Sequence, residues 1–419
     1  MATNTISRKR SVRTKRSRQS VSRRRGAAAR RPRRTRGVAK KVALIAGGIV
    51  VVLIVAALAV FGAAEQKVKD CCLPGDQSAQ VVFDQATANA QSIPMTGALG
   101  EELRRAAADY RSIGLIGVGG DGKAVSDEVF DMTPKLENGT VLKVAARAEE
   151  ATTKNLELVA QKINDTSASE PGQAMFLGLE RLQLNTRVPI YIVSSLLDTA
   201  DPLDMRRLGW DVSPKRVVRD LKKSGELPDL SGADITFVVR PVAGGQEQLR
   251  QPQVEYREAL WSALAKASGA TKVRFEYVDG TGAASTVAAP VVPIPAPPST
   301  PVPVNPEART CTVDTSAYFA PDSARLLDPA STKTALRDCV QQIGPDSSVT
   351  VVGHTAGSDP NNTFALNLSL KRAKAISKLL ESLGVPSGHI KAVGMGNRNQ
   401  PYPDPYDARN RSVVVTITN

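Results

Sequence analysis

The sequence predicts an α/β protein with two folded domains that follow a single apolar span. Three observations predict this class: a chain of 419 residues exceeds one small domain, one segment is almost wholly apolar, and short apolar runs alternate with helical patterns on both sides of a proline-rich stretch. In chain order we expect a basic tail (1–41), a transmembrane helix (42–64), a Rossmann-like α/β domain (73–280), a proline-rich linker (281–306) and a second α/β domain (307–419).

The tail at residues 1–41 carries the positive charge of the chain. It holds 17 of the 55 Lys and Arg residues and no Asp or Glu, so the remaining 38 basic and 41 acidic residues nearly balance. Without apolar periodicity the tail is predicted to be disordered. Such a segment can bind nucleic-acid phosphates or anionic lipid heads. We favour a role in membrane topology with lipid attraction, and we expect no nucleic-acid partner.

Residues 42–64 predict the transmembrane helix. As a helix these 23 residues span about 35 Å, and a bilayer core is about 30 Å thick. A cleaved signal peptide is the alternative, because small residues occur at "FGAA", but its apolar region would be roughly 7 to 15 residues long. Lys40 and Lys41 precede the span and Glu65 follows it, so the positive-inside rule places the N-terminus in the cytoplasm and residues 65–419 outside.

Four cysteines lie in this extracytoplasmic part. Cys311 and Cys339 flank the first predicted strand and helix of the second domain and could form a disulfide in an oxidising compartment. Cys71 and Cys72 could bond to each other, to a partner or to nothing. No cysteine or histidine spacing suggests a metal site, so we predict no metal and no cofactor from them.

The linker is defined by its prolines, of which eight lie in residues 290–306. Proline-rich chains adopt extended polyproline II, which here predicts a spacer able to hold two domains up to about 50 Å apart.

The first domain shows the alternation of strands and helices that predicts a mostly parallel sheet. Its predicted strands are 79–84, 112–120, 188–195, 233–240 and 271–278, and its clearest helical patterns are 100–111, 155–165 and 254–268. In such sheets ligands bind at the carboxyl ends of the strands, here "FDQATA" and "SSLLDTADP".

Those two strand ends resemble a von Willebrand A-like domain, in which Asp-x-Ser-x-Ser and a second acidic residue bind Mg²⁺. Asp84 and Asp198 are the matching acidic residues, but Ala86 and Ala88 stand at the hydroxyl positions and Thr87 is out of step. Because Mg²⁺ needs those oxygens, Asp84 and Asp198 are weak metal candidates only. The strings "DTADPLDMRRLGW" and "LPDLSGADITF" resemble the middle region of membrane-anchored OmpA-family proteins of actinobacteria.

The sequence of the second domain predicts the order strand, helix, strand, helix, strand, strand. The segments are a strand and turn at 315–328, a helix at 329–344, a strand at 347–355, a helix at 368–384, and strands at 388–396 and 411–418. This βαβαββ order and its motifs resemble an OmpA-like domain. The motifs are "GHT" at 353–355, "LSLKRA" at 368–373, "LGVPSGHIKAVGMG", Pro401, and "NR" at 410–411.

The resemblance implies non-covalent binding of peptidoglycan through the carboxylate and amine of a diamino acid. Arg372 matches the family's carboxylate-binding arginine, a role that suits a guanidinium. Ala356 replaces the acidic residue that binds the amine, and Ala365 replaces an asparagine. The predicted binding residues are Arg372, Asp359, Thr355, Asn367 and Arg411.

The sequence thus predicts an envelope protein that tethers the membrane to the cell wall or senses it. The alternative is a protein-interaction scaffold, in which an unknown protein binds the first domain and the OmpA-like domain no longer binds peptidoglycan. A wall hydrolase is a third class. We expect no enzyme activity, because His354 and His389 lie in separate turns and the chain has no phosphate loop or nucleophile elbow.

Overall fold

The computed structural model describes residues 76–418 except 167, 169, 283 and 284. The basic tail, the predicted transmembrane helix at 42–64, Cys71 and Cys72 all lie outside the described residues. Among the helices of the described part, none combines the length and the apolar character needed to cross a bilayer.

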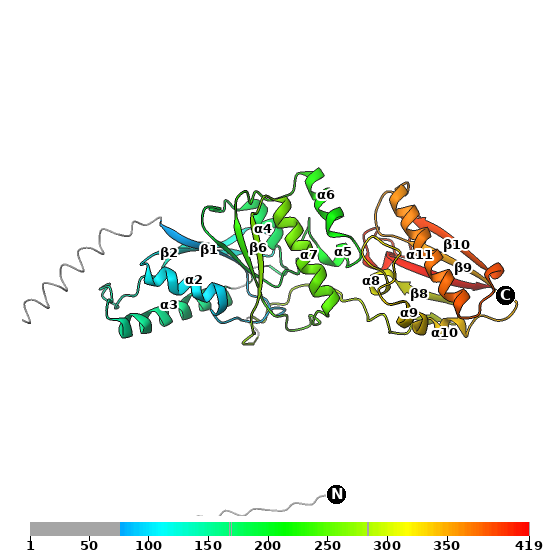
Figure 1. Ribbon diagram of the computed structural model, residues 1–419, viewed down its shortest axis with the longest axis horizontal. Helices are drawn as coiled ribbons and strands as arrows, with labels where there is room; N and C mark the ends of the chain where they lie inside the picture. Colours follow the sequence, from blue (N-terminus) through cyan, green and yellow to red (C-terminus); the bar gives the residue numbers. More distant parts are fainter. Residues whose placement is uncertain (1–75, 167, 169, 283–284, 419) are drawn as a thin grey trace, which may run out of the picture. The chain divides into compact units, whose positions relative to one another are not determined.

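The first domain is built on a six-stranded sheet with the order β3-β2-β1-β4-β5-β6. Figure 1 labels β1, β2 and β6 of this sheet. All neighbouring strands are parallel except β2 and β3, which are antiparallel. The strands are β1 Gln77–Asp84, β2 Ser112–Val118, β3 Ala124–Asp131, β4 Ile190–Ser194, β5 Asp234–Val239 and β6 Lys272–Tyr277. The sequence therefore identified five strands, and β3 was missed.

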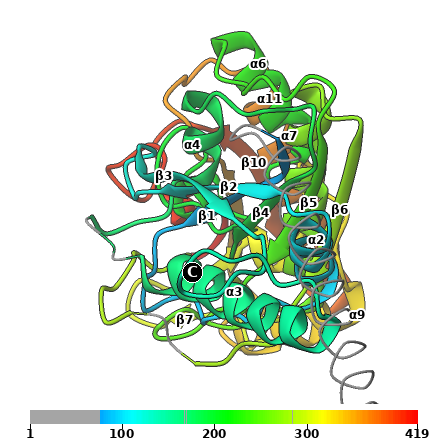
Figure 2. The same cartoon turned by 90° about the vertical axis from the view of Figure 1, so that its left-hand side faces the viewer.

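Helices cover both faces of this sheet (Figure 2). One core packs strand residues against α2 and α3, and the other packs the alternate strand residues against α4, α6 and α7. Alternate residues of a strand point to opposite faces, which explains the two cores. The helices are α2 Gly97–Ala108, α3 Ala145–Asp165, α4 Met175–Arg181, α5 Met205–Leu208, α6 Pro214–Ser224 and α7 Gln251–Ala267.

The C-terminal domain has a five-stranded sheet with the order β10-β9-β11-β8-β7. β9 and β10 are parallel, whereas β11 is antiparallel to both β8 and β9. The strands are β7 Val304–Asn305, β8 Thr310–Asp314, β9 Ser348–His354, β10 Ile390–Gly396 and β11 Ser412–Thr418. A third, separate core lies between this sheet and its helices.

The helices of the C-terminal domain include one long helix, α11 Thr363–Ser382, which packs on β9 and β10 (Figure 1). The shorter ones are α8 Thr315–Tyr318, α9 Pro329–Ala335, α10 Arg337–Val340, and the 3-10 helices η1 Ser387–His389 and η2 Ala408–Asn410. The predicted strand at the start of 315–328 is wrong: the strand β8 ends at Asp314, whose side chain then caps α8 by accepting from Ser316 N.

The predicted disulfide between Cys311 and Cys339 is confirmed. It joins β8 to α10, and both cysteines are fully buried in the third core.

The proline-rich segment is not a free spacer. Val292 is buried in a core of the first domain, and Trp210 donates its indole N–H to the carbonyl of Pro293 at 2.8 Å. Further along, Val302 is buried in the core of the C-terminal domain. Apolar side chains between the prolines therefore fasten each end of the segment to a domain, which the polyproline composition alone did not predict.

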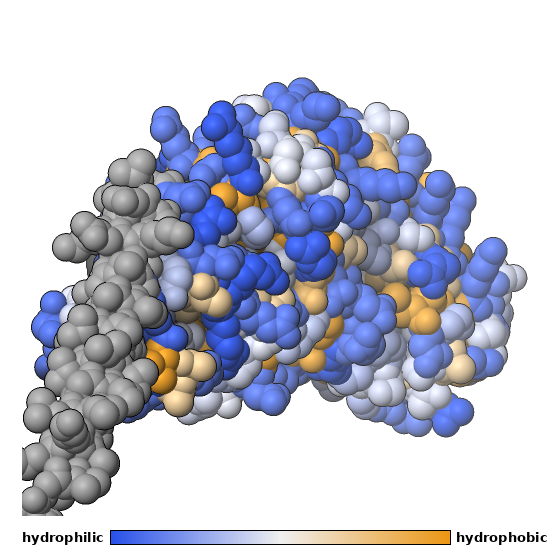
Figure 3. Space-filling model, turned by 60° about the vertical axis from the view of Figure 1, so that its left-hand side comes forward, coloured by the Kyte–Doolittle hydropathy of each residue, from blue (hydrophilic) through white to orange (hydrophobic). Residues whose placement is uncertain are grey.

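The face shown in Figure 3 carries hydrophobic residues in small groups among hydrophilic ones. Scattered apolar side chains of this kind are normal on a protein surface and do not mark a binding site.

Candidate functional site

A cleft of about 210 Å³ lies where the C-terminal domain meets the first domain. Most of its lining comes from the loop between β9 and α11, from α11 itself, and from the residues before β11; the first domain contributes two residues just before and at the start of α6. The lining residues are Asp211, Arg216, Thr355, Ala356, Gly357, Ser358, Asp359, Asn362, Ala365, Leu368, Arg372, Asn397, Tyr406 and Arg411.

The β9–α11 loop is shaped by hydrogen bonds to the segment after β10. Thr355 donates its hydroxyl to Asn397 Oδ1 at 2.6 Å, and Asn397 Nδ2 donates to the carbonyl of Asp359 at 2.9 Å. Asn362 then caps α11 by accepting from Ala365 N at 3.0 Å. The polar "GSDPNN" sequence is thus held as a defined wall of the cleft, because its side chains bond to nearby backbone N–H groups and to Tyr406 and Arg398.

Arg372 projects from α11 to the floor of the cleft and is only 1% exposed. Its Nη1 donates to Asp211 Oδ2 at 2.7 Å, and its Nε donates to the carbonyl of Ser323 at 2.9 Å. The guanidinium lies 5.4 Å from the ring centre of Phe319, within reach of a cation–π interaction. The arginine is therefore held rigidly with its charge directed at one carboxylate.

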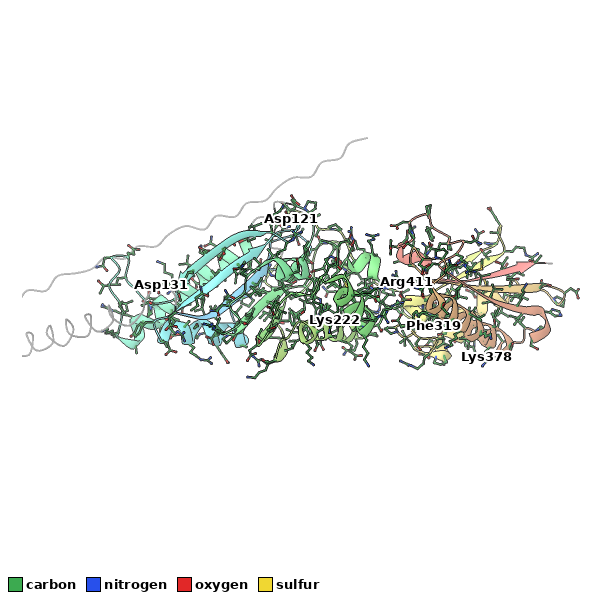
Figure 4. All side chains as sticks on the ribbon, turned by 90° about the horizontal axis from the view of Figure 1, so that it is seen from above. Asp121, Asp131, Lys222, Phe319, Lys378 and Arg411 are labelled. Carbon is green, nitrogen blue, oxygen red and sulfur yellow. A yellow bond between two sulfur atoms is a disulfide. The ribbon has the colours of Figure 1, made fainter. Side chains whose placement is uncertain are left out.

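Arg411, at the end of η2, contacts the same carboxylate from the other side. Its Nε lies 3.1 Å from Asp211 Oδ1, and its Nη2 donates to the carbonyl of Arg207 at 2.7 Å. Figure 4 labels Arg411 on the part of the C-terminal domain that faces the first domain. Burial lowers the pKa of Arg411, and the charge of Asp211 partly offsets that effect.

Asp211 is the carboxylate between the two arginines, and it belongs to the first domain. It is 3% exposed, and its Oδ2 also accepts from the Thr315 hydroxyl at 2.9 Å. Burial alone would raise its pKa, but Arg372 and Arg411 outweigh burial and bring the pKa of Asp211 below its ordinary value. Asp211 is therefore ionised at neutral pH.

The loop that carries Asp211 is fixed on the first domain. Gly209 ends α5 with a φ of +67°, a conformation that favours glycine, and a Cβ there would lie 3.3 Å from Arg411 Nη1. Trp210 packs edge-on against Tyr256, with ring centres 5.5 Å apart, and the Tyr256 hydroxyl donates to the carbonyl of Val212 at 2.7 Å.

A second group of contacts joins the two domains beside the cleft. Asp322 accepts from Ser213 N at 2.9 Å, and its other oxygen lies 2.7 Å from Arg216 Nη2. The backbone N–H of Asp322 donates to the carbonyl of Asp211 at 2.7 Å. Arg216 also lies over the ring of Phe364, at 5.1 Å from its centre.

The structure brings together four of the five binding residues predicted from the sequence. Arg372, Asp359, Thr355 and Arg411 line the cleft, whereas Asn367 is exposed on α11 outside the lining. Asp359 is exposed, and its Oδ1 accepts from Asn361 N at 2.9 Å.

Sequence reasoning missed Asp211, which lies 161 positions before Arg372. The only local sign is an acidic residue in a short loop, after Gly209 and before the Ser213–Pro214 start of α6. That pattern predicts a turn and a helix start but no contact with another domain.

The weak metal candidates Asp84 and Asp198 lie near each other at the carboxyl ends of β1 and β4, and both are buried. Burial raises the pKa of Asp84 to about 6, with Ser194 and Arg240 opposing the rise. Burial and then the charge of Asp84 raise the pKa of Asp198 to about 8. Within the described residues no group of three or more His, Cys, Asp or Glu side chains could hold a metal ion.

His354 lies at the end of β9, next to the cleft wall, and is buried. Burial lowers its pKa, with a smaller opposing effect from the backbone of Arg398. His354 is therefore a strand residue and not the turn residue that the sequence predicted, and burial favours its neutral form.

Comparison with known proteins identifies the domain that contributes most of the cleft. Residues 318–412 match the model of the OmpA family, so the C-terminal domain belongs to that family. Over 119 residues the chain is 29% identical to outer membrane protein 40 of Porphyromonas gingivalis; the match covers 28% of this chain and 30% of that protein. The chain thus spans less than a third of this curated relative.

Solved structures similar to the chain each cover 26% of it. The periplasmic domain of Helicobacter pylori MotB has 16% identity, a TM-score of 0.23 and 75% of its own chain covered. The OmpA-like domain of FopA1 from Francisella tularensis has 26% identity, a TM-score of 0.20 and 71% of its own chain covered. The peptidoglycan-associated lipoprotein from Burkholderia pseudomallei has 24% identity, a TM-score of 0.22 and 89% of its own chain covered.

Proposed function

We propose that this protein binds peptidoglycan non-covalently through its C-terminal domain and thereby tethers the membrane to the cell wall or senses the wall. The observation that carries the proposal is the pair Arg372 and Arg411, which hold one carboxylate at the floor of a polar cleft. The OmpA-family match supports the same reading. The predicted transmembrane helix at 42–64 would anchor the chain, with the N-terminus in the cytoplasm and the basic tail near anionic lipid.

The chemistry suits a peptide that presents a carboxylate beside an ammonium group, as the diamino acid of a peptidoglycan stem peptide does. Guanidinium groups bind carboxylates by strong, charge-assisted hydrogen bonds, so Arg372 and Arg411 would take the carboxylate. Asp359, which also lines the cleft, would bind the ammonium in place of the acidic residue that Ala356 replaces. Thr355 would contribute a hydroxyl, and Asn367 would contact the ligand from outside the lining.

The first domain contributes binding of a second kind in this proposal. This domain, which resembles a von Willebrand A domain, would provide a surface for an unknown protein partner. Asp84 and Asp198 would then be structural carboxyl groups. Both are buried, and the pKa of Asp198 is raised to about 8, which makes that residue a poor ligand for a cation at neutral pH. The protein as a whole is proposed to act by binding, without catalysis.

Co-sedimentation of the full chain in detergent with purified peptidoglycan tests the proposal. We expect Arg372→Gln to lower the affinity at least tenfold, because loss of one partner of a desolvated charge pair costs several kcal/mol. Lys374→Gln is the matched control, since it removes the same charge from an exposed position on the same helix, and it should bind like the wild type.

Two results would contradict the proposal. If the wild type stays in the supernatant, the scaffold function of the first domain becomes the better hypothesis. If the wild type sediments but Arg372→Gln and Lys374→Gln sediment equally well, binding does not use the cleft. Release of soluble wall fragments by the wild type would instead reveal a hydrolase.

A further inference from the structure

The arginine pair of the cleft is already occupied by a carboxylate of the same chain. Asp211 Oδ2 accepts from Arg372 Nη1 and from the Thr315 hydroxyl, and Oδ1 faces Arg411 Nε. A carboxylate from a wall peptide would need these same donors. The remaining N–H groups, Nη2 of Arg372 and Nη1 of Arg411, are buried and have no hydrogen-bond partner among the described residues. A ligand therefore cannot use the arginines while Asp211 is in place.

The loop that carries Asp211 cannot move away from the arginines by itself. Its neighbours Trp210 and Val212 are fastened to the first domain through Tyr256 and Pro293. Its own carbonyl accepts from Asp322 N of the C-terminal domain. Moving the backbone of Asp211 away from the arginines thus requires the two domains to separate at this contact.

The contact between the two domains is of a kind that can open. It consists of charged and polar groups and two arginine–aromatic contacts, while the apolar cores of the two domains remain separate. Polar interfaces between domains of one chain commonly open and close. The proline-rich segment 290–306 joins the domains covalently, so they would stay close after opening.

We propose that the first domain is an internal inhibitor of wall binding, in which Asp211 occupies the arginine site as a substitute for the carboxylate of the wall peptide. This inference rests on the proposed function. A wall peptide binds only the separated form, so its apparent affinity is reduced by the fraction of molecules that are open. A partner that binds the first domain and draws it away would raise the affinity for the wall.

The test uses the full chain in detergent and the soluble stem tripeptide of peptidoglycan, which carries the diamino acid, with affinity measured by calorimetry. Asp211→Asn removes the competing charge and keeps the size of the side chain; we expect it to bind at least tenfold more tightly than the wild type. Asp322→Asn weakens the neighbouring contact without touching the arginines, and it should bind more tightly by a smaller factor. Asp220→Asn changes an exposed acid of α6 whose carboxylate forms an ion pair with Arg219, and it should bind like the wild type.

Variants of Arg372 separate the inhibitor proposal from the proposed function. Adding Arg372→Gln to Asp211→Asn should abolish the gain in affinity. If Asp211→Asn binds no better than the wild type, while Arg372→Gln alone weakens wild-type binding, the inhibitor proposal fails and the proposed function stands. If no variant binds the tripeptide, both fail. Should Asp211→Asn not fold, as judged by its thermal unfolding, Asp322→Asn decides: no gain in its affinity overturns the inhibitor proposal.

Discussion

Buried aspartates in the first domain differ in their pKa because their neighbours differ. Asp211 is buried between two guanidinium groups, which bring its pKa below the ordinary value of 3.8 despite burial. Its contribution to stability is therefore fully present above about pH 4 and is lost only as the pH falls through the lowered pKa. Mild acidification to pH 5 should leave the contact between the domains intact.

Asp198 shows the opposite behaviour, and it gives a prediction about pH. Its pKa is raised to about 8, so its neutral form stabilises the fold fully below pH 3.8, and that stability is lost as the pH rises through 8. We expect the free energy of unfolding of the wild type to fall between pH 5 and pH 9, and Asp198→Asn to reduce this fall. Urea unfolding followed by tryptophan fluorescence measures it, because both tryptophans, Trp210 and Trp261, lie in the first domain.

The control for this prediction is Asp220→Asn, which changes an exposed acid of the same domain and should keep the wild-type pH dependence. An Asp198→Asn variant that loses as much stability between pH 5 and pH 9 as the wild type would show that Asp198 ionises normally.

A cleft residue could be predicted from the sequence only when its contacts lie close to it along the chain. Arg372, Arg411, Thr355 and Asp359 were found because they lie in or beside short motifs of one domain. Asp211 was not, because its partner is 161 positions away and a lone acidic residue in a turn is common.

At the scale of the elements, burial decided what could be predicted. β1, β2, β4 and β5 are almost wholly buried because helices cover both faces of the sheet, and their apolar sequences showed it. β6 is a partly exposed edge strand, but its Val273, Phe275 and Tyr277 alternate with charged residues, and this alternation still indicated a strand. β3 is an edge strand whose residues are partly or fully exposed, so "AVSDEVFD" lacks a clear apolar pattern. α8 has four residues and is defined by the cap from Asp314, which is too short for helical periodicity to appear.

The disulfide Cys311–Cys339 is expected to contribute to the stability of the C-terminal domain. It closes a loop with a sequence separation of 28 and ties α10 to β8. In the loop-entropy picture such a bond contributes roughly 3 to 4 kcal/mol. We expect the double variant Cys311→Ala/Cys339→Ala to lose about that much free energy of unfolding, measured by urea unfolding of the C-terminal domain with far-ultraviolet circular dichroism.

A reducing agent should lower the stability of the wild type similarly and leave the double variant unchanged. Equal stability of the oxidised wild type and the double variant would mean that the bond does not constrain the unfolded chain.

At the scale of the whole molecule, the sequence indicated two domains and a linker but not how they meet. Each domain has its own core, and these cores were predictable from apolar patterns. The contact between the domains is made by charged and polar side chains, which have no periodic pattern. The apolar residues Val292 and Val302 of the linker were hidden among prolines.

This contact leads to a prediction about energetic coupling between the domains. Asp211 and Arg372 form an ion pair with both side chains nearly fully buried, and residues in direct contact show coupling energies of about 0.5 to 3 kcal/mol. In a double-mutant cycle with Asp211→Asn and Arg372→Gln, we expect the two losses of free energy of unfolding to be non-additive by about 1 to 3 kcal/mol. Losing either partner leaves the other charge buried, so the second change costs much less than the first.

The matched cycle uses Arg219→Gln and Asp220→Asn, an exposed ion pair of neighbouring residues on α6, where we expect coupling below about 0.5 kcal/mol. Urea unfolding of the full chain in detergent, followed by tryptophan fluorescence, gives the free energies of unfolding of the wild type, the four single variants and the two double variants. If the Asp211–Arg372 cycle is additive within about 0.3 kcal/mol, the domains are not held together by this pair. Coupling of the expected size would instead show that the charge of one domain stabilises the other, as an internal carboxylate in the arginine site requires.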